Sequence, residues 1–195
     1  QTFSLAFVYD LPFGKGKRLL NKGGVSDKVL GGWGLNSIVR LQSGTPLFFR
    51  SGVCNVPGQF RAACIPAQVS GADPFAQGKS DFDPARGPLL NSGAFEDPAG
   101  FNFYYGKGPR ISNLRGFGYN NHDLTLFKRT QITERVRFEV RAEFFNVWNS
   151  HVFRCTSRCF GDQGFDTDVA SPTFGEWNGA VTAPRTIQLS GKIVF

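Results

Sequence analysis

Apolar and polar residues alternate along the segment RVRFEVRAEFF, residues 135–145, with a period of two. Apolar side chains stand at Val136, Phe138, Val140, Ala142 and Phe144, and Arg or Glu fills the positions between them. Successive side chains leave a β-strand on opposite faces, so this pattern predicts a strand with one apolar face and one charged face. It does not say which face is enclosed. A soluble sandwich or calyx would bury the apolar face, whereas a membrane barrel would turn it to lipid.

The same alternation predicts about six strands along the chain. They are expected at residues 2–12, 32–42, 45–51, 121–131, 134–146 and 185–195. Long connections are expected at 13–31, 52–120 and 147–184, and tight turns at QSGT, residues 42–45, and TQITE, residues 130–134. Long and short connections thus alternate, which in an antiparallel up-and-down sheet places them at opposite rims. This asymmetry is typical of a transmembrane β-barrel with long extracellular loops.

Composition narrows the function classes. The net charge of +7 permits an anionic partner such as lipopolysaccharide, but no recognised nucleic-acid motif occurs, so no nucleic-acid partner is expected. No nucleophile elbow, metalloprotease or dinucleotide fingerprint occurs, and the only histidines are His122 and His151, so no enzyme and no cofactor are expected. No apolar run approaches the roughly 20 residues of a spanning helix.

All four cysteines fall in the expected long connections. Their close spacing predicts two local disulfides, Cys54 with Cys64 and Cys155 with Cys159, with pairing between loops as the alternative. His151, Cys155 and Cys159 with Asp162 nearby form a weaker zinc candidate, and Asp162, Asp166 and Asp168 a weaker calcium candidate. Neither spacing follows a standard motif, so no metal site is expected.

Several segments together resemble the C-terminal end of TonB-dependent outer-membrane receptors, of the Oar-like group with a carboxypeptidase-regulatory-like domain. They are LPFGKGKRLL at 11–20, KVLGGWGLNSIVRLQSGTP at 28–46, residues 114–149, SPTFG at 171–175 and PRTIQLSGKIVF at 184–195. The resemblance implies a barrel of about 22 strands that encloses a plug and takes up a ligand with energy from TonB. The plug, further strands and the TonB-contacting segment would then precede Gln1.

The resemblance also implies which way each face points. The lipid-facing candidates are Val136, Phe138, Val140, Phe144, Ile187, Leu189 and Ile193. The lumen-facing candidates are Arg40, Arg137, Glu139, Arg141, Glu143, Gln188 and Lys192. The terminal Phe195 matches the aromatic residue that the barrel assembly machinery recognises. Expected partners are outer-membrane lipid, lipopolysaccharide, that machinery and the TonB system.

Two other functions stay open from the sequence. One is a soluble β-calyx or sandwich that binds a small apolar ligand. The other is a surface adhesion or scaffold protein that shares the barrel but transports nothing. The basic segment 13–31, with Lys15, Lys17, Arg18, Lys22 and Lys28 against Asp27, would face lipopolysaccharide phosphates if it is extracellular.

Overall fold

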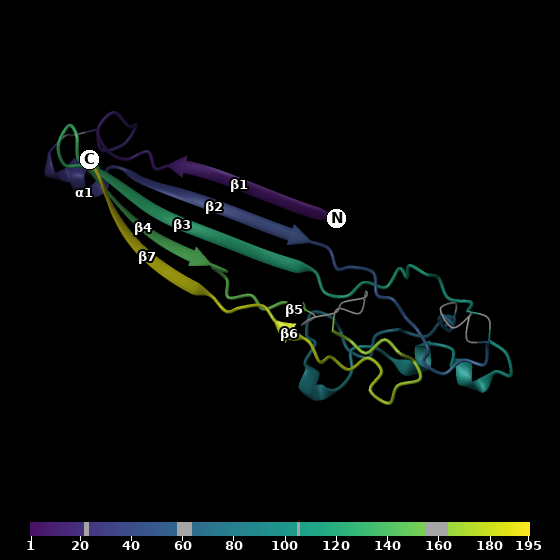
Figure 1. The fold of residues 1–195 in the computed structure, drawn as a ribbon. Coiled ribbons are helices and arrows are strands. Elements are labelled where there is room, and N and C mark those ends of the chain that lie inside the picture. The colour runs from purple at the N-terminus through teal and green to yellow at the C-terminus, as the bar shows by residue number, and fades with distance from the viewer. Residues whose placement is uncertain (22–23, 58–63, 105, 155–163) are drawn as a thin grey trace. The chain divides into compact units, whose positions relative to one another are not determined.

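The computed structural model describes residues 1–195 except 22–23, 58–63, 105 and 155–163 (Figure 1). The described chain divides into two compact units. Unit 1 contains residues 1–42, 119–151 and 183–195, and unit 2 contains residues 43–118 and 152–182. Among the described residues, no helix is both long and apolar enough to cross a membrane.

Unit 1 is an open antiparallel sheet of five strands in the order β1-β2-β3-β4-β7 (Figure 1). The strands are β1 Thr2–Asp10, β2 Trp33–Gln42, β3 Tyr119–Gln131, β4 Arg137–Phe145 and β7 Thr186–Val194. The short helix α1, Val25–Leu30, lies in the connection between β1 and β2. Each of these strands overlaps a range in which apolar and polar residues alternate. β1 and β7 form the two edges of the sheet.

The register fixes where each connection lies. Asp10 pairs with Gly34 and Gln131 with Arg137, so residues 11–32 and the tight turn at 132–136 lie at one end of the sheet. We call this the turn end; it also holds Val194, which pairs with Arg137. Residues 43–118 and 146–185 both leave the sheet at its other end, which we call the long-loop end.

The expected strand at 45–51 is wrong. Within this range Pro46 and Arg50 form only isolated bridges, to Arg115 and Asp168. Its apolar positions Leu47 and Phe49 are instead buried in unit 2, which explains the apolar pattern without a sheet. As a result, the long connection at 13–31 lies at the same end as the tight turn, not at the opposite end.

Unit 2 joins the two longest connections around one aromatic core. Its buried members include Phe49, Phe82, Phe95, Phe165 and Phe174, drawn from both chain segments. Phe49 and Phe95 have ring centroids 4.5 Å apart, within the usual range for aromatic pairs. The unit also contains the 3-10 helices η2 Pro84–Arg86, η3 Ser92–Ala94 and η4 Pro98–Gly100, and the short pair β5 Phe153–Arg154 and β6 Ala180–Val181. The two longest connections therefore form one folded body.

The predicted disulfide between Cys54 and Cys64 is confirmed, with a Cα–Cα distance of 6.3 Å. It links two points of residues 43–118 inside unit 2. The second predicted pair, Cys155 with Cys159, lies outside the described residues.

Candidate functional site

One face of the sheet in unit 1 is largely apolar across all five strands. Directly paired residues in adjacent strands share a face. Phe138 pairs with Ile193, and the row of Leu35, Leu126, Ala142 and Leu189 is continuous through three pairings. The apolar members are Phe3, Leu5, Phe7, Tyr9, Trp33, Leu35, Val39, Leu41, Leu124, Leu126, Phe138, Val140, Ala142, Phe144, Ile187, Leu189 and Ile193.

This apolar face is open to its surroundings over much of its area. Leu189 is 75% exposed, Ile193 60% and Phe3 55%. A contiguous exposed apolar surface of this kind marks a contact with another apolar phase or a partner. Val136, predicted to belong to the same face, lies in the tight turn instead, where its carbonyl accepts hydrogen bonds from the backbone amides of Ile132 and Thr133.

The opposite face carries the charges. The structure brings together the candidates Arg137, Glu139, Arg141 and Glu143 of β4 with Gln188 and Lys192 of β7 on one surface. Lys192 pairs directly with Glu139, and Gln188 with Glu143. Arg40 lies on the same face in β2, paired with Asn121 of β3.

A buried carboxylate forms the centre of this charged face. Glu139 is 5% exposed and accepts hydrogen bonds from Nε of Arg129, at 3.0 Å, and from Nε of Arg141. The Arg129 guanidinium also lies over the Phe127 ring, 4.4 Å from its centroid. Phe127 breaks the apolar and polar alternation of its strand. It fits here because it lies beside Gly34, whose added Cβ would come within 2.2 Å of the ring.

Arg129 was not among the candidates from the sequence, because its strand alternates poorly around Phe127. The signal that could have found it is its position two residues after Phe127, which places both side chains on one face. The two arginines, one in β3 and one in β4, place a positive charge on each side of the Glu139 carboxylate. The cluster therefore holds β3 and β4 together on the charged face.

The polar side chains Ser37, His122 and Lys128 on the apolar face all have hydrogen-bond partners. Ser37 Oγ, in the middle of β2, and His122 Nε2, nearer the long-loop end, are 2.8 Å apart, and the Trp148 indole donates a hydrogen bond to His122 Nδ1 at 2.9 Å. Because Nδ1 accepts this hydrogen bond, Nε2 carries the proton and donates to Ser37. Trp148 reaches His122 because the chain folds back after β4 at Asn146, which has a positive φ, and the Val147 amide bonds the His122 carbonyl.

At the turn end, Lys128 is the charged residue that β3 places on the apolar face. Its ammonium donates to the carbonyl oxygens of Val29, at 2.8 Å, and Gly31, at 2.7 Å. It also lies 5.1 Å from the centroid of the Trp33 ring. These contacts direct the charge away from the apolar surface and onto the C-terminal carbonyls of α1.

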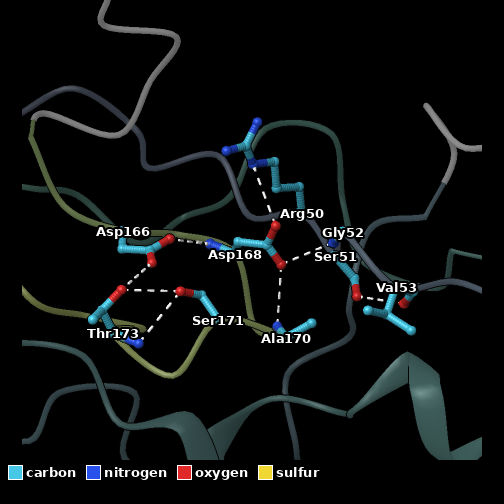
Figure 2. Close-up of polar contacts among 9 residues, drawn as sticks. All are labelled: Arg50, Ser51, Gly52, Val53, Asp166, Asp168, Ala170, Ser171 and Thr173. Atoms are coloured by element: carbon cyan, nitrogen blue, oxygen red, sulfur yellow. Dashed lines mark hydrogen bonds and ion pairs between the residues drawn. The ribbon is translucent and has the colours of Figure 1, made fainter.

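In unit 2, a polar cluster connects the two chain segments (Figure 2). Asp168 accepts hydrogen bonds from the backbone amides of Gly52, at 2.8 Å, and Ala170, at 3.1 Å, and lies 3.9 Å from Nε of Arg50. Asp166 accepts hydrogen bonds from the Asp168 backbone amide and the Thr173 hydroxyl. Each carboxylate is thus engaged by donors of unit 2 itself, which fits a structural role.

The environment of Asp166 lowers its pKa. Desolvation by itself raises the pKa, but hydrogen bonds from Ser171, Asp168 and Thr173 and the nearby charge of Arg50 outweigh it. The buried Tyr104 shows the opposite direction, since desolvation raises its pKa and its hydroxyl also donates to Glu96. Both groups therefore favour the charge state that their contacts in unit 2 require.

The described residues contain no group of three or more His, Cys, Asp or Glu side chains that could hold a metal ion. Asp166 and Asp168, two members of the calcium candidate, bind different donors in the cluster of Figure 2. Asp162, like Cys155 and Cys159 of the zinc candidate, lies outside the described residues.

A family model for an outer membrane beta barrel domain matches residues 1–188. The chain belongs to this outer membrane beta barrel family. Its location is therefore the bacterial outer membrane. No curated protein and no solved structure matches the chain.

Family membership changes how the two faces of this barrel domain are understood. In outer-membrane barrels the outward face is apolar because it contacts lipid, and the inward face is polar. The expectation of an all-β, antiparallel outer-membrane protein is confirmed. The alternative of a soluble calyx or sandwich is not supported.

Proposed function

We propose that this chain forms part of the wall and outer loops of a TonB-dependent receptor that takes up a ligand across the outer membrane. The observation that carries the proposal is the register of the sheet, which keeps an apolar face and a charged face continuous over five strands. The sequence resemblance supplies the TonB-dependent class. The ligand can be a saccharide, a peptide or a metal chelate, and the proposal includes no catalytic step.

In this proposal the apolar face meets lipid and the charged face lines the lumen. A wet lumen accounts for the accumulation of Arg and Glu around Glu139, because partly exposed charges are tolerated where water is present. Opposite charges that face each other across strands also help to hold the wall together. The same cluster provides charged groups that a plug or a passing ligand can contact.

We assign the long-loop end to the extracellular side and the turn end to the periplasm. Short periplasmic turns and long extracellular loops are the rule in such barrels, and the tight turn at 132–136 fits the periplasmic side. Phe195 follows β7 at the turn end and is 96% exposed, so it is available to the barrel assembly machinery. Unit 2, with its disulfide, then faces the oxidising exterior.

The orientation is tested by labelling intact cells with a membrane-impermeant maleimide. Ser70→Cys adds a thiol at an exposed position of unit 2, and Glu134→Cys adds one in the tight turn. Labelling of the first variant but not the second supports the orientation, provided that both label after the cells are lysed. Labelling of Glu134→Cys alone in intact cells would reverse it.

The transport function is tested by ligand uptake. Cells that lack the gene should lose uptake of one class of solute, and cells that lack TonB should lose the same uptake. If the gene is required for attachment to a surface while uptake of every tested solute continues, the adhesion or scaffold function is correct instead. That alternative rests on unit 2, whose two chain segments share one buried core.

A further inference from the structure

The connection between β1 and β2, residues 11–32, folds against the turn end of the sheet. Asp27 Oδ1 accepts a hydrogen bond from the Lys15 backbone amide at 2.5 Å, and Lys128 bonds the carbonyls of Val29 and Gly31. Gly14, with φ of +112°, approaches Gly31 so closely that an added Cβ would come within 2.7 Å of its Cα. The described residues of this connection therefore have a defined shape at the rim.

An apolar groove of about 390 Å³ lies between this connection and the sheet. Leu11, Phe13, Leu20 and Leu30 of the connection line it together with Trp33 and Leu126. Trp33 and Leu126 are members of the apolar face, so the groove continues the surface that we assign to lipid. Its volume lies within the range of small-molecule and lipid sites.

A cationic cavity of about 410 Å³ adjoins the groove, and Phe13 lines both. Its charged lining consists of Lys15, Lys17, Lys28, Arg129 and one carboxylate, Asp27. Lys17 and Arg129 have carboxylate partners of their own, Asp10 and Glu139. Lys15 and Lys28 form no ion pair within the described part of the chain, so their charge is available to an anion.

The rim also exposes apolar side chains beside these lysines. Val25 is 78% exposed, Val29 58% and Leu20 53%. Exposed aliphatic side chains mixed with lysines are typical of segments that lie in the interface of a membrane. An apolar groove next to unpaired cations requires an occupant with a hydrocarbon chain and a negative head group.

We propose that the described residues of the connection 11–32 bind an anionic glycerophospholipid of the periplasmic leaflet, with an acyl chain in the apolar groove and the phosphate at Lys15 and Lys28. This inference rests on the proposed orientation, because the turn end must face the periplasm. It replaces the lipopolysaccharide contact expected for this basic segment from the sequence. Lipopolysaccharide occupies the opposite leaflet, at the long-loop end.

The test is native mass spectrometry of the intact outer-membrane protein, delipidated in detergent and titrated with phosphatidylglycerol, phosphatidylcholine or lipid A. Phosphatidylglycerol should bind more tightly than the other two. The variant Lys15→Gln with Lys28→Gln should weaken phosphatidylglycerol binding roughly 25-fold and leave phosphatidylcholine nearly unchanged, since each lysine near an anionic head group contributes about fivefold.

Two further variants make the result specific. The control Arg110→Gln with Arg135→Gln removes the same number of exposed charges outside the cavity and should leave lipid binding unchanged. Leu20→Asn changes a groove residue whose φ of 54° suits asparagine, so the fold should be kept. It should weaken both phospholipids by a similar factor.

Equal affinity for phosphatidylglycerol and phosphatidylcholine, or an equal loss in the control, would overturn the proposal. A preference for lipid A would also overturn it and would point to the outer leaflet. Each variant is first checked for the gel shift between heated and unheated samples that a folded barrel gives. If the double lysine variant does not fold, the lipid binding of Leu20→Asn tests the proposal instead. If maleimide labelling of the two cysteine variants supports the orientation but the protein does not select among lipids, only this inference fails and the proposed function stands.

Discussion

Introducing one arginine on each face of β7 tests which face meets lipid. Leu189 belongs to the apolar face, where it pairs with Ala142, and Gln188 belongs to the charged face, where it pairs with Glu143. The two residues are neighbours in one strand, so Leu189→Arg and Gln188→Arg differ mainly in the direction of the new side chain. We expect Leu189→Arg to destabilise the barrel strongly and Gln188→Arg to leave it nearly unchanged.

The position of Leu189 sets the magnitude. β7 has 9 residues, Thr186–Val194, so it is about 30 Å long and spans roughly 23 Å of membrane thickness at a tilt of about 40°. Leu189 is next to the central residue Ser190 and therefore lies within a few ångströms of the midplane. An arginine facing lipid at that depth costs about 2 to 4 kcal/mol. An arginine at position 188 gains roughly 0.2 to 1 kcal/mol from the opposing Glu143.

The assay is reversible unfolding of the intact protein in lipid vesicles by guanidinium chloride, followed by tryptophan fluorescence. The free energy of unfolding should be lower for Leu189→Arg than for Gln188→Arg by at least about 2 kcal/mol. Equal free energies for the two variants, or a larger loss for Gln188→Arg, would refute the assignment of the apolar face to lipid.

Three further predictions concern single interactions. Glu139→Gln should lower the free energy of unfolding of the barrel by about 1 to 3 kcal/mol, because two charge-assisted hydrogen bonds are weakened. The vesicle assay measures this free energy, and an unchanged value would contradict the stabilising role of the cluster. Cys54→Ser with Cys64→Ser opens a link across a sequence separation of 10 and should destabilise unit 2 by about 2 to 3 kcal/mol, seen as faster proteolysis while the heat-dependent gel shift of the barrel stays. Because the pKa of Asp166 is lowered in the folded state, its contribution to stability is fully present above the ordinary pKa and is lost as the pH falls through the lowered pKa. The melting temperature of unit 2, followed by Trp177 fluorescence, should therefore fall on acidification below about pH 4. Asp166→Asn should flatten that dependence, and an unchanged acid shift in this variant would assign the dependence to another group.

The sheet could be predicted from the sequence because its signal is local. Alternation with a period of two reports which face each residue takes, and in β4 it continues without a break from Arg137 to Phe144. Phe127 interrupts it in β3, since its ring is on the charged face beside Gly34. That arrangement depends on a residue almost a hundred positions away and cannot be seen in the strand alone.

The folding of the two longest connections into unit 2 could not be predicted, because it depends on contacts between distant segments. Phe49 packs against Phe95 and Phe174, and Arg50 meets Asp168, so neither segment has its core without the other. Leu47 and Phe49 have the same apolar spacing in this core as they would have in a strand. Periodicity alone could not separate the two cases, which is why 45–51 was predicted as a strand.

Because the predicted strand at 45–51 does not form, a whole connection lies at a different end of the sheet from the one predicted. Strands of an up-and-down sheet alternate in direction, so each strand decides at which rim the next connection lies. With the predicted strand at 45–51 absent, the connections before it lie at the opposite rim from the one predicted, relative to the connections after it. The basic segment 11–32 thereby joins the tight turn 132–136 and the end of β7. In the proposed orientation, its lysines would meet the periplasmic leaflet. The charge of this segment alone suggests lipopolysaccharide, whereas its position in the register, together with the proposed orientation, favours the anionic phospholipid that we propose.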